Sequence, residues 1–397
     1  MNKHVLFRAA SIGMLLSLRI HGVCLAQTVD REFVQNQLGF ATHQLMSMAD
    51  ALGSTNKIPR SVKDDSIHLR SIGDWTSGFF PGSLWYVYEY SRDPAVKAKA
   101  EWFTHILEAN QKKKGTHDLG FMMNCSYGNG LRLAQNSDYA HILVQTTQTL
   151  CERFNPTIGC IRSWDFGSWK FPVIIDNMMN LELLFWATKA TGDQSYYKKA
   201  VSHANTTMAN HFRTDQSTWH VIDYDPDTGK VRGRHTHQGQ SDESAWARGQ
   251  SWGLYGFTMC YRETGDPAYL KQAEAIAKLI LFHSNLPSDM IPYWDYDAED
   301  IPNEPRDASA AAITCSSFLD LYRLTHKTIY LKVADQILLS LSSPEYRAKK
   351  VGDNHHFILR HSVGSKPKKS EVNTPINYAD YYYVESLMRR LALLKNE

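Results

Sequence analysis

The feature that most constrains the fold of this chain is a helical unit that recurs along it. Each copy begins with a polar or glycine-rich loop, continues into an apolar helix, turns, and runs into a second, more amphipathic helix. Paired helices repeated at roughly 40–70 residues indicate a helical array. Copies begin near Asp74, His117, Ile175, Ala247 and Arg306, and a last helix of the first type is predicted over 377–393.

The turns inside the copies repeat most clearly. Residues 191–200 align with residues 264–273, and both stretches begin with Thr-Gly-Asp. Residues 325–334 keep the Tyr, Lys and Ala positions of that pattern. A glycine in the left-handed conformation ends one helix, and the aspartate that follows caps the next. Six helix pairs with such short turns favour a closed ring, so we predict an all-α protein with an (α/α)6 barrel.

The two helices of each pair differ in their apolar surface. The first helices, over residues 178–186, 252–260 and 310–321, are apolar on most faces, which predicts an inner position. The second helices carry lysines on one face, which predicts an outer position.

Strand signals are few. Residues 220–224 and 230–232 flank Asp227-Thr228-Gly229 and predict a short β-hairpin in a loop. Residues 357–362 predict one further strand. The segment that holds Pro59 and the charged run 63–65 is predicted to be a loop after a helix over 29–51.

The first residues are typical of an export signal. Lys3, His4 and Arg8 precede an apolar run over 9–18, and residues 24–26 resemble a cleavage site, although a lipoprotein cleavage before Cys24 is also open. We therefore expect a signal peptide at 1–26, one catalytic domain at 27–397, and a periplasmic location. No later segment reaches the roughly 20 apolar residues of a membrane span.

Net charge and cysteine content limit the kinds of partner and metal site that the sequence indicates. A net charge of only +2 gives no indication of nucleic-acid binding. The cysteines form no CxxC pair, so no metal site is indicated. Cys151 and Cys160 are candidates for a disulfide, whereas buried free thiols are expected at Cys125, Cys260 and Cys315.

The predicted ring brings distant residues to one end. If inner helices alternate with outer ones, every inner helix starts at the same mouth, where its free N–H groups favour an anion. The residues placed there are Trp75, Asp118, Asp176, Arg248 and Asp307. Taken alone, Asp118 and Asp176 are each better explained as helix caps than as catalytic residues. Together they form a candidate acid/base pair, because a carboxyl in an apolar setting near another carboxylate has a raised pKa.

The stretch from residue 220 to residue 252 is too long and too aromatic for a simple connection. Indole faces and a guanidinium suit a sugar ring that carries a carboxylate. The alternative is a surface loop with chance histidines. The candidate substrate-binding residues are His220, His237, Gln238, Trp246, Arg248 and Trp252, with Trp75 from an earlier loop.

Two other segments have open interpretations. Trp164 and Trp169 either belong to a loop that faces the sugar or have a packing role. Ser365 with residues 366–369 forms either a sulfate-binding or a solvated loop.

At these residues the sequence resembles the unsaturated glucuronyl hydrolases of glycoside hydrolase family 88. The matching pieces are WTSGFFPG from Trp75, HDLGF from His117, IDNMMNL from Ile175, HQG from His237 and WARGQSW from Trp246. They span the chain from about Trp75 to Tyr383. The resemblance implies an (α/α)6 barrel with no metal and no cofactor. It also implies an unsaturated, anionic oligosaccharide as the substrate, and a monomer or weak homo-oligomer is expected.

The resemblance also implies the reaction. Lyases leave a non-reducing uronic acid with a C4=C5 double bond; an acid protonates C4, water adds at C5, and the hemiketal rearranges and releases the sugar. Asp176 matches the general acid and base of the family. Asp118 matches a second aspartate that contacts the ring hydroxyls and tunes Asp176.

Three alternatives remain at this point. The related unsaturated rhamnogalacturonyl hydrolases act on pectin fragments. An exported sugar-binding protein without catalysis would bind the oligosaccharide and leave its double bond intact. An inverting glucanase on the same barrel would cleave saturated glucans.

Overall fold

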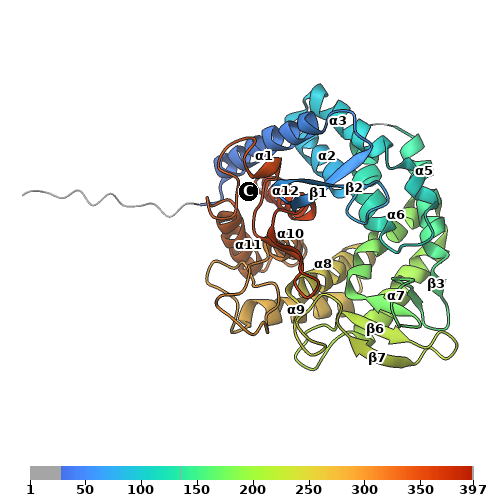
Figure 1. The fold of residues 1–397 in the computed structure, drawn as a ribbon. Helices are drawn as coiled ribbons and strands as arrows, with labels where there is room; N and C mark the ends of the chain where they lie inside the picture. The colour runs from blue at the N-terminus through green and yellow to red at the C-terminus, as the bar shows by residue number, and fades with distance from the viewer. Residues whose placement is uncertain (1–27, 135, 396–397) are drawn as a thin grey trace, which may run out of the picture.

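The computed structural model describes residues 28–134 and 136–395 and shows a ring of helices seen end-on in Figure 1. The inner helices are α2 (Phe79–Ser91), η2 (Gly120–Gly128) with α4 (Asn129–Ala134), η3 (Ile175–Asn180) with α6 (Leu181–Thr191), α8 (Ala247–Thr264), α10 (Ala308–Thr325) and α12 (Asn377–Leu394). The outer helices are α1 (Arg31–Leu52), α3 (Pro94–His105), α5 (Asp138–Cys151), α7 (Gln194–Asn210), α9 (Pro267–Phe282) and α11 (Thr328–Leu341). Two short 3₁₀ turns, η1 (Glu108–Lys112) and η4 (Asn354–His356), lie in connections.

The ring closes through the two ends of the chain. Helix α12 contacts α10 on one side and α2 on the other, and α1 packs against both α2 and α12. The blue α1 and the red α12 accordingly lie next to each other in Figure 1. The remaining inner helices contact their neighbours in chain order, so the predicted (α/α)6 barrel is confirmed.

The repeated turns have the predicted capping chemistry. Gly192 ends α6 with a φ of 78°, and Gly265 ends α8 with a φ of 72°. The side chain of Asp193 accepts a hydrogen bond from the backbone N–H of Ser195, and Asp266 accepts one from Ala268. Each turn therefore stops an inner helix and starts an outer one within two residues.

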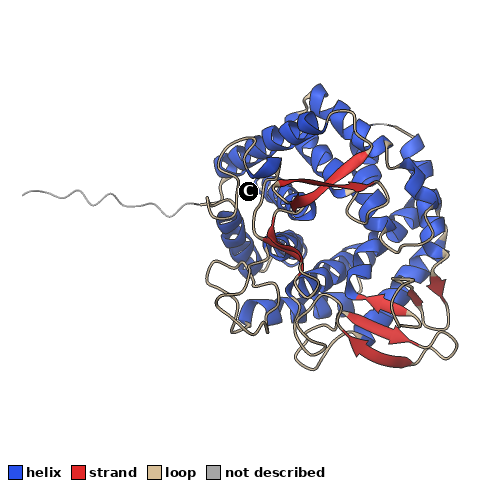
Figure 2. Ribbon diagram, viewed as in Figure 1, coloured by secondary structure: helices blue, strands red, loops and turns tan. Residues whose placement is uncertain are grey.

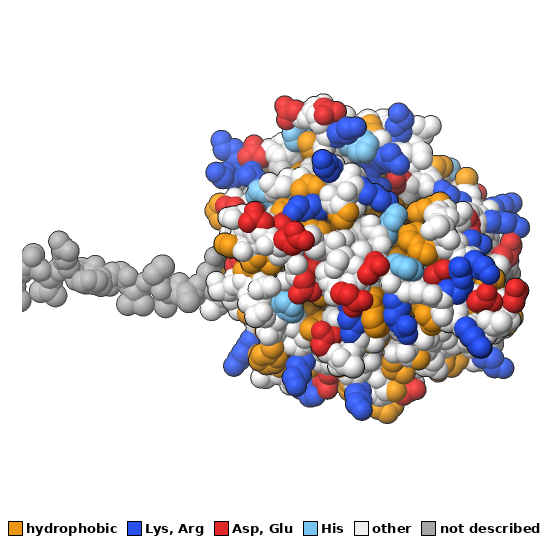
Figure 3. Space-filling view, turned by 60° about the horizontal axis from the view of Figure 1, so that its bottom comes forward, with side chains coloured by type: hydrophobic (Ala, Val, Ile, Leu, Met, Phe, Trp, Pro, Cys, Tyr) orange, Lys and Arg blue, Asp and Glu red, His pale blue; other side chains and the backbone are white. Residues whose placement is uncertain are grey.

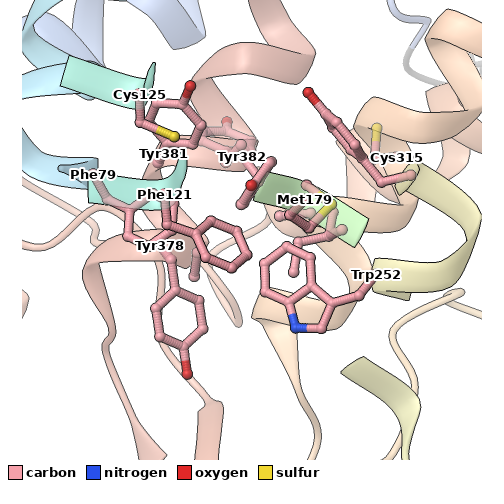
Figure 4. Close-up of a cluster of buried hydrophobic side chains, with 14 of the residues drawn as sticks. Phe79, Phe121, Cys125, Met179, Trp252, Cys315, Tyr378, Tyr381 and Tyr382 are labelled. Carbon is pink, nitrogen blue, oxygen red and sulfur yellow. The ribbon is translucent and has the colours of Figure 1, made fainter. Parts of the chain in front are cut away.

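Aromatic side chains from several inner helices fill the middle of the barrel (Figure 4). The rings of Phe121 and Trp252 have centroids 5.1 Å apart, and Tyr382 lies 5.5 Å from Trp252. Phe79 packs against Phe121 at 5.5 Å. Edge-to-face and tilted contacts of this kind stabilise a core beyond the area that they bury.

Strands occur as short hairpins in the loops, two of them over the opening of the ring in Figure 2. The two-stranded pairs are β1 (Lys57–Lys63) with β2 (Ser66–Ser71), β3 (Phe154–Asn155) with β4 (Cys160–Ile161), and β8 (Ser362–Ser365) with β9 (Ser370–Thr374). A three-stranded antiparallel sheet has β6 (Val221–Tyr224) between β5 (Pro172–Ile174) and β7 (Val231–His235).

The strand predictions had mixed outcomes. The predicted hairpin around Asp227-Thr228-Gly229 is confirmed as β6–β7, although its second strand extends to His235. The strand predicted over 357–362 is wrong, because pairing starts only at Ser362. The loop predicted around Pro59 is also wrong. Asp64 and Asp65 adopt φ values of 48° and 54°, which suit a tight hairpin turn between β1 and β2.

The cysteines of the described part of the chain are all free. Cys125, Cys260 and Cys315 are buried, as predicted. Cys151 and Cys160 form no disulfide with each other, because each is a free thiol.

The predicted signal segment, 1–26, lies outside the described residues. Over the ranges that are described, every helix is too short or too polar to cross a bilayer. Acidic and basic side chains are interspersed on the face shown in Figure 3.

Candidate active site

A cavity of about 340 Å³ opens at the end of the barrel where the inner helices begin. Its volume lies within the range of small-molecule sites. It is lined by Arg60, Trp75, Gly115, Thr116, His117, Asp118, Ser163, Trp164, Asp165, Phe166, Ile174, Asp176, His237, Gln238, Arg248, Gly364, Ser365, Lys368, Ser370, Glu371 and Tyr378. The single mouth predicted from the helix order is therefore present, and both candidate carboxyls reach it.

Asp176 lies in the first turn of η3, and its side chain does not cap the helix, since the N-cap position belongs to Ile174. The residue is 7 % exposed, and its Oδ1 has no hydrogen-bond partner among the described residues. Burial raises the pKa of this carboxyl to about 7, with a further rise from Asp118, while the positive charge of Arg248 acts in the opposite direction. Asp176 can therefore hold a proton near neutral pH.

Asp118 lies just before η2, and it does not cap that helix either. Its Oδ2 accepts a hydrogen bond from Thr116 Oγ1 at 3.0 Å, and its Oδ1 lies 3.1 Å from Nε2 of His117. Burial raises the pKa of Asp118 to about 7, and the nearby carboxylate of Asp74 adds to the rise. Because neither aspartate serves as a cap, the structural explanation that competed with an acid/base pair is removed.

His220 stands behind Asp176 with one defined tautomer. Its Nδ1 accepts hydrogen bonds from the backbone N–H groups of His237 at 3.1 Å and Gln238 at 3.2 Å. Burial, together with the nearby His237 and Arg248, lowers the pKa of His220 well below its usual value, so the ring is neutral. The hydrogen of the neutral ring is then on Nε2, which lies 3.7 Å from Asp176 Oδ1.

Arg248 is held rigidly at the base of the cavity. The guanidinium pairs with Asp307 at 3.1 Å and donates to the backbone carbonyls of Gly364, at 2.6 Å, and Val363. It lies over the ring of Trp246, with 4.5 Å between the Arg248 Cζ and the ring centroid. Asp307 itself does not line the cavity, contrary to the prediction. It caps α10 and is fully buried behind Arg248.

The predicted substrate-binding residues fall into two layers. Trp75, His237, Gln238 and Arg248 line the cavity directly. The second layer lies behind this lining and consists of His220, Trp246 and Trp252. Trp246 stacks against His220 with centroids 4.6 Å apart. Trp252 is fully buried in the aromatic core.

Several lining residues were not predicted. His117 could have been predicted from its position next to Asp118. Tyr378 could have been predicted from its place in the first turn of the sixth inner helix. Arg60 comes from the hairpin that was interpreted as a loop. Trp164, for which a sugar-facing loop and a packing role were both open, lines the cavity, with its ring centroid 4.8 Å from that of His237. Trp169 does not line the cavity and packs against Trp164, with 5.5 Å between the ring centroids.

Within 28–134 and 136–395, no group of three or more His, Cys, Asp and Glu side chains is arranged to hold a metal ion.

Comparison with known proteins identifies relatives over almost the whole chain. An unsaturated glucuronyl hydrolase of Formosa agariphila is 47 % identical over 344 residues, which cover 85 % of this chain and 86 % of the relative. An unsaturated chondroitin disaccharide hydrolase of Streptococcus pneumoniae is 33 % identical, with 80 % of this chain and 81 % of the relative covered.

The fold gives the same result. The crystal structure of an unsaturated glucuronyl hydrolase specific for heparin superposes with a TM-score of 0.89 at 49 % identity, covering 92 % of this chain and 98 % of the other. No family model matches the sequence. The extent and identity of these matches show that this chain belongs to the unsaturated glucuronyl hydrolases and is a glycoside hydrolase.

Proposed function

We propose that this enzyme releases 4,5-unsaturated glucuronic acid from the non-reducing end of glycosaminoglycan oligosaccharides left by lyases. The observation that carries the proposal is the pair of carboxyls in one cavity, the partly buried Asp118 and the buried Asp176, beside the buried cation of Arg248. A protonated carboxyl supplies the acid, and a fixed guanidinium attracts the uronate.

In the proposed reaction Asp176 acts first as an acid. Its proton adds to C4 of the vinyl ether, and the electron deficiency develops at C5 beside the ring oxygen. The Asp176 carboxylate then takes a proton from the water that adds to C5, which restores the acid. The resulting hemiketal opens and releases the neighbouring sugar.

The groups around Asp176 support this cycle. The Nε2–H of neutral His220 lies 3.7 Å from Asp176 Oδ1, beyond hydrogen-bond distance, and its dipole can stabilise the carboxylate that forms after proton transfer. Arg248 lines the cavity, and its fixed positive charge attracts the uronate. Trp75 offers an aromatic face to the sugar ring.

The rim of the cavity suits a sulfated second sugar. Ser365 and Lys368 line it, with the Lys368 ammonium in contact with Nε2 of His237, whereas Lys366 is paired with Glu304. One relative is named for chondroitin disaccharides and another as specific for heparin. We therefore place the substrate among sulfated glycosaminoglycan disaccharides rather than pectin fragments.

A spectrophotometric assay tests the proposal. Unsaturated disaccharides from hyaluronan, chondroitin sulfates, heparan sulfate and pectin are incubated with the enzyme, and the ultraviolet absorbance of the conjugated enoate is followed. Loss of absorbance with glycosaminoglycan disaccharides is expected. Retained absorbance with every glycosaminoglycan substrate would contradict the proposal, and binding without loss would favour a sugar-binding protein.

Export to the periplasm, a single domain over residues 27–397, and a monomeric or weakly associating state remain our predictions. Detection of the mature protein in the periplasmic fraction, with its N-terminus after residue 26, tests the first of them.

A further inference from the structure

We propose that Arg153 is a positioning residue that fixes two segments of the cavity wall, 115–118 and 163–166, relative to each other and thereby sets the affinity for the sugar. The inference rests on the proposed function, because it concerns substrate binding in the same site. Arg153 follows the outer helix α5 and does not line the cavity, so it acts through the groups that it holds.

The Arg153 guanidinium donates all five of its N–H groups. Nε donates to the backbone carbonyl of Arg162 at 2.9 Å, Nη1 to that of Lys114 at 2.7 Å, and Nη2 to that of Ser163 at 3.2 Å. The other two bonds go to both carboxylate oxygens of Asp165, at 2.8 and 2.9 Å. The Arg153 side chain is 8 % exposed, so these bonds form largely out of water. Only arginine supplies five donors in one planar fork.

The two segments joined by this guanidinium make up a large part of the cavity wall. All four residues of 115–118 and all four residues of 163–166 line the cavity. The first segment contains Asp118, and the second contains the rings of Trp164 and Phe166, which stack with centroids 5.0 Å apart. One side chain outside the cavity therefore connects the carboxyl side of the site to an aromatic side.

The aromatic segment has few other supports. Among the described residues, no backbone–backbone hydrogen bond involves residues 164–169. Apart from the fork on Asp165, the Trp164 carbonyl accepts from Nε of Arg162 at 2.9 Å, and the same Nε lies 3.4 Å from Asp165. The position of the Trp164 ring thus depends strongly on the bonds between Arg153 and Asp165.

The segment that contains Asp118 is held more firmly. The backbone N–H of Asp118 donates to Thr116 Oγ1 at 3.1 Å, and its carbonyl accepts from the backbone N–H of Met122 at 2.9 Å. Nδ1 of His117 lies 2.8 Å from the Ser163 carbonyl oxygen. Loss of the fork should therefore displace the aromatic segment first and leave the carboxyls in place, which raises KM more than it lowers kcat.

The discriminating variant is Arg153→Lys, which keeps the positive charge and replaces the fork by three donors on one nitrogen. We expect KM for an unsaturated disaccharide to rise about three- to tenfold, as for the loss of one aromatic contact with the sugar. The effect on kcat should stay within about twofold, because the hydrogen bonds of Arg153 do not reach Asp176.

The matched control is Arg262→Lys. Arg262 likewise binds several partners, the carboxylates of Glu182, Glu263 and Asp320, and it does not line the cavity. This variant should lose stability and keep the wild-type KM. The same rise in KM in Arg262→Lys as in Arg153→Lys would overturn the inference, since a general loss of stability would then be sufficient.

A double-mutant cycle tests whether Arg153 acts through Trp164. In Trp164→Ala the ring that Arg153 positions is absent, so the addition of Arg153→Lys should change KM by less than about twofold. An equal rise in KM with and without Trp164 would overturn the inference. An unchanged KM in Arg153→Lys alone would do the same.

Asp165→Asn is a second variant that puts the fold at less risk, because the Asp165 side chain is 48 % exposed. It removes one acceptor of the fork. The loss of a negative charge from the cavity wall would by itself favour an anionic substrate, so a rise in KM reports the loss of the fork. A KM that falls or stays the same would contradict the inference.

A measurement without substrate tests the position of the ring directly. In protein labelled with 5-fluorotryptophan, the ¹⁹F resonance of Trp164 is assigned by its absence in Trp164→Ala. It should shift or broaden in Arg153→Lys, whereas that of the fully buried Trp252 should stay in place. An unchanged Trp164 resonance would overturn the inference.

A wild-type enzyme that leaves every unsaturated disaccharide intact is a different result. It would contradict the proposed function, and the ¹⁹F spectrum would still decide whether Arg153 positions Trp164.

Discussion

The two ends of the barrel contain the same kinds of buried charged side chains and use them in opposite ways. At the end where the inner helices start, Asp118 and Asp176 lie in a cavity without a guanidinium within 4 Å of either carboxyl among the described residues. Toward the other end, a cavity of about 640 Å³ is lined by Glu385 and Arg389, whose side chains pair at 3.3 Å.

Two acidic side chains near the second cavity, Glu385 and Asp320, each have several hydrogen-bond or ion-pair partners. Glu385 accepts from the hydroxyls of Tyr86 at 2.9 Å and Tyr255 at 3.1 Å. Asp320 pairs with Arg262 at 2.9 Å and with Arg323 at 2.7 Å. Although burial acts in the other direction, the guanidinium groups hold the pKa of Asp320 below its usual value.

Burial alone therefore does not make a carboxyl a catalytic acid. Burial raises the pKa of a carboxyl at either end, and nearby cations decide whether the rise survives. At the second end the ion pairs of Asp320 keep this acid charged. At the first end the guanidinium groups of Arg60 and Arg248 pair with other carboxylates, those of Glu371 and Asp307. This leaves Asp118 and Asp176 without a paired guanidinium and able to hold protons, which is the pattern of a functional site.

The largest expected effect is on turnover at the first end. Asp176→Asn should lower kcat by about 10³-fold or more, because a positioned acid contributes about 10²–10⁴-fold and this residue also acts as the base. The absorbance assay measures the loss, and circular dichroism checks that the fold survives. Full activity in this variant would refute the role.

A comparable change at the second end should affect stability instead. Arg389→Met leaves Glu385, 4 % exposed, without its cation, which costs about 3 kcal/mol. Denaturant unfolding measures this loss. The KM of the variant near 25 °C should equal that of the wild type, and a changed KM would break the distinction between the two ends.

The free energy of unfolding should change with pH in opposite directions through the acids at the two ends. The folded pKa of Asp176 is raised above its unfolded value of 3.8, so its stabilisation is complete below about pH 4 and is lost as pH rises toward 7. The folded pKa of Asp320 is lowered, so its stabilisation exists above about pH 4 and is lost at lower pH.

Thermal unfolding tests this difference. Asp176→Asn should stabilise the protein at pH near 8 by on the order of 2 kcal/mol and change little near pH 4. Asp320→Asn should destabilise it near pH 7. Effects of the same sign in both variants at neutral pH would contradict the comparison.

The smallest expected effect concerns specificity at the rim. Lys368→Ser should raise KM for a sulfated disaccharide by about two- to fivefold, because an exposed ion pair contributes up to about 1 kcal/mol. KM for the unsulfated disaccharide should stay the same. Lys350→Ser, an exposed lysine outside the cavity lining, is the control.

The ring and its active mouth could be predicted because both follow from local rules. Thr-Gly-Asp turns and apolar helices repeat in the sequence, and a closed ring of alternating helices brings the starts of all inner helices together. That reasoning was sufficient to place Asp118 and Asp176 in one cavity.

The failures have a common physical cause, since side-chain direction depends on packing that a sequence does not state. Asp307 and Trp252 were placed near the mouth, but Asp307 turns back to pair with Arg248 and Trp252 packs against Phe121. The hairpin that contains Arg60 was not predicted, because Pro59 is a residue that disfavours a strand. The Arg60 side chain is positioned by ion pairs with Asp74 and Glu371, which lie in other segments.

The most direct test is an NMR titration of the Asp176 carboxyl in protein labelled with ¹³C at aspartate, assigned by comparison with Asp176→Asn. Among the residues that the structure describes, none donates a hydrogen bond to Oδ1, and the side chain is almost fully buried, so its signal should titrate with a midpoint near 7. A midpoint near 4, as in an ordinary solvated aspartate, would mean that Asp176 carries no proton at neutral pH and would contradict its role as the acid.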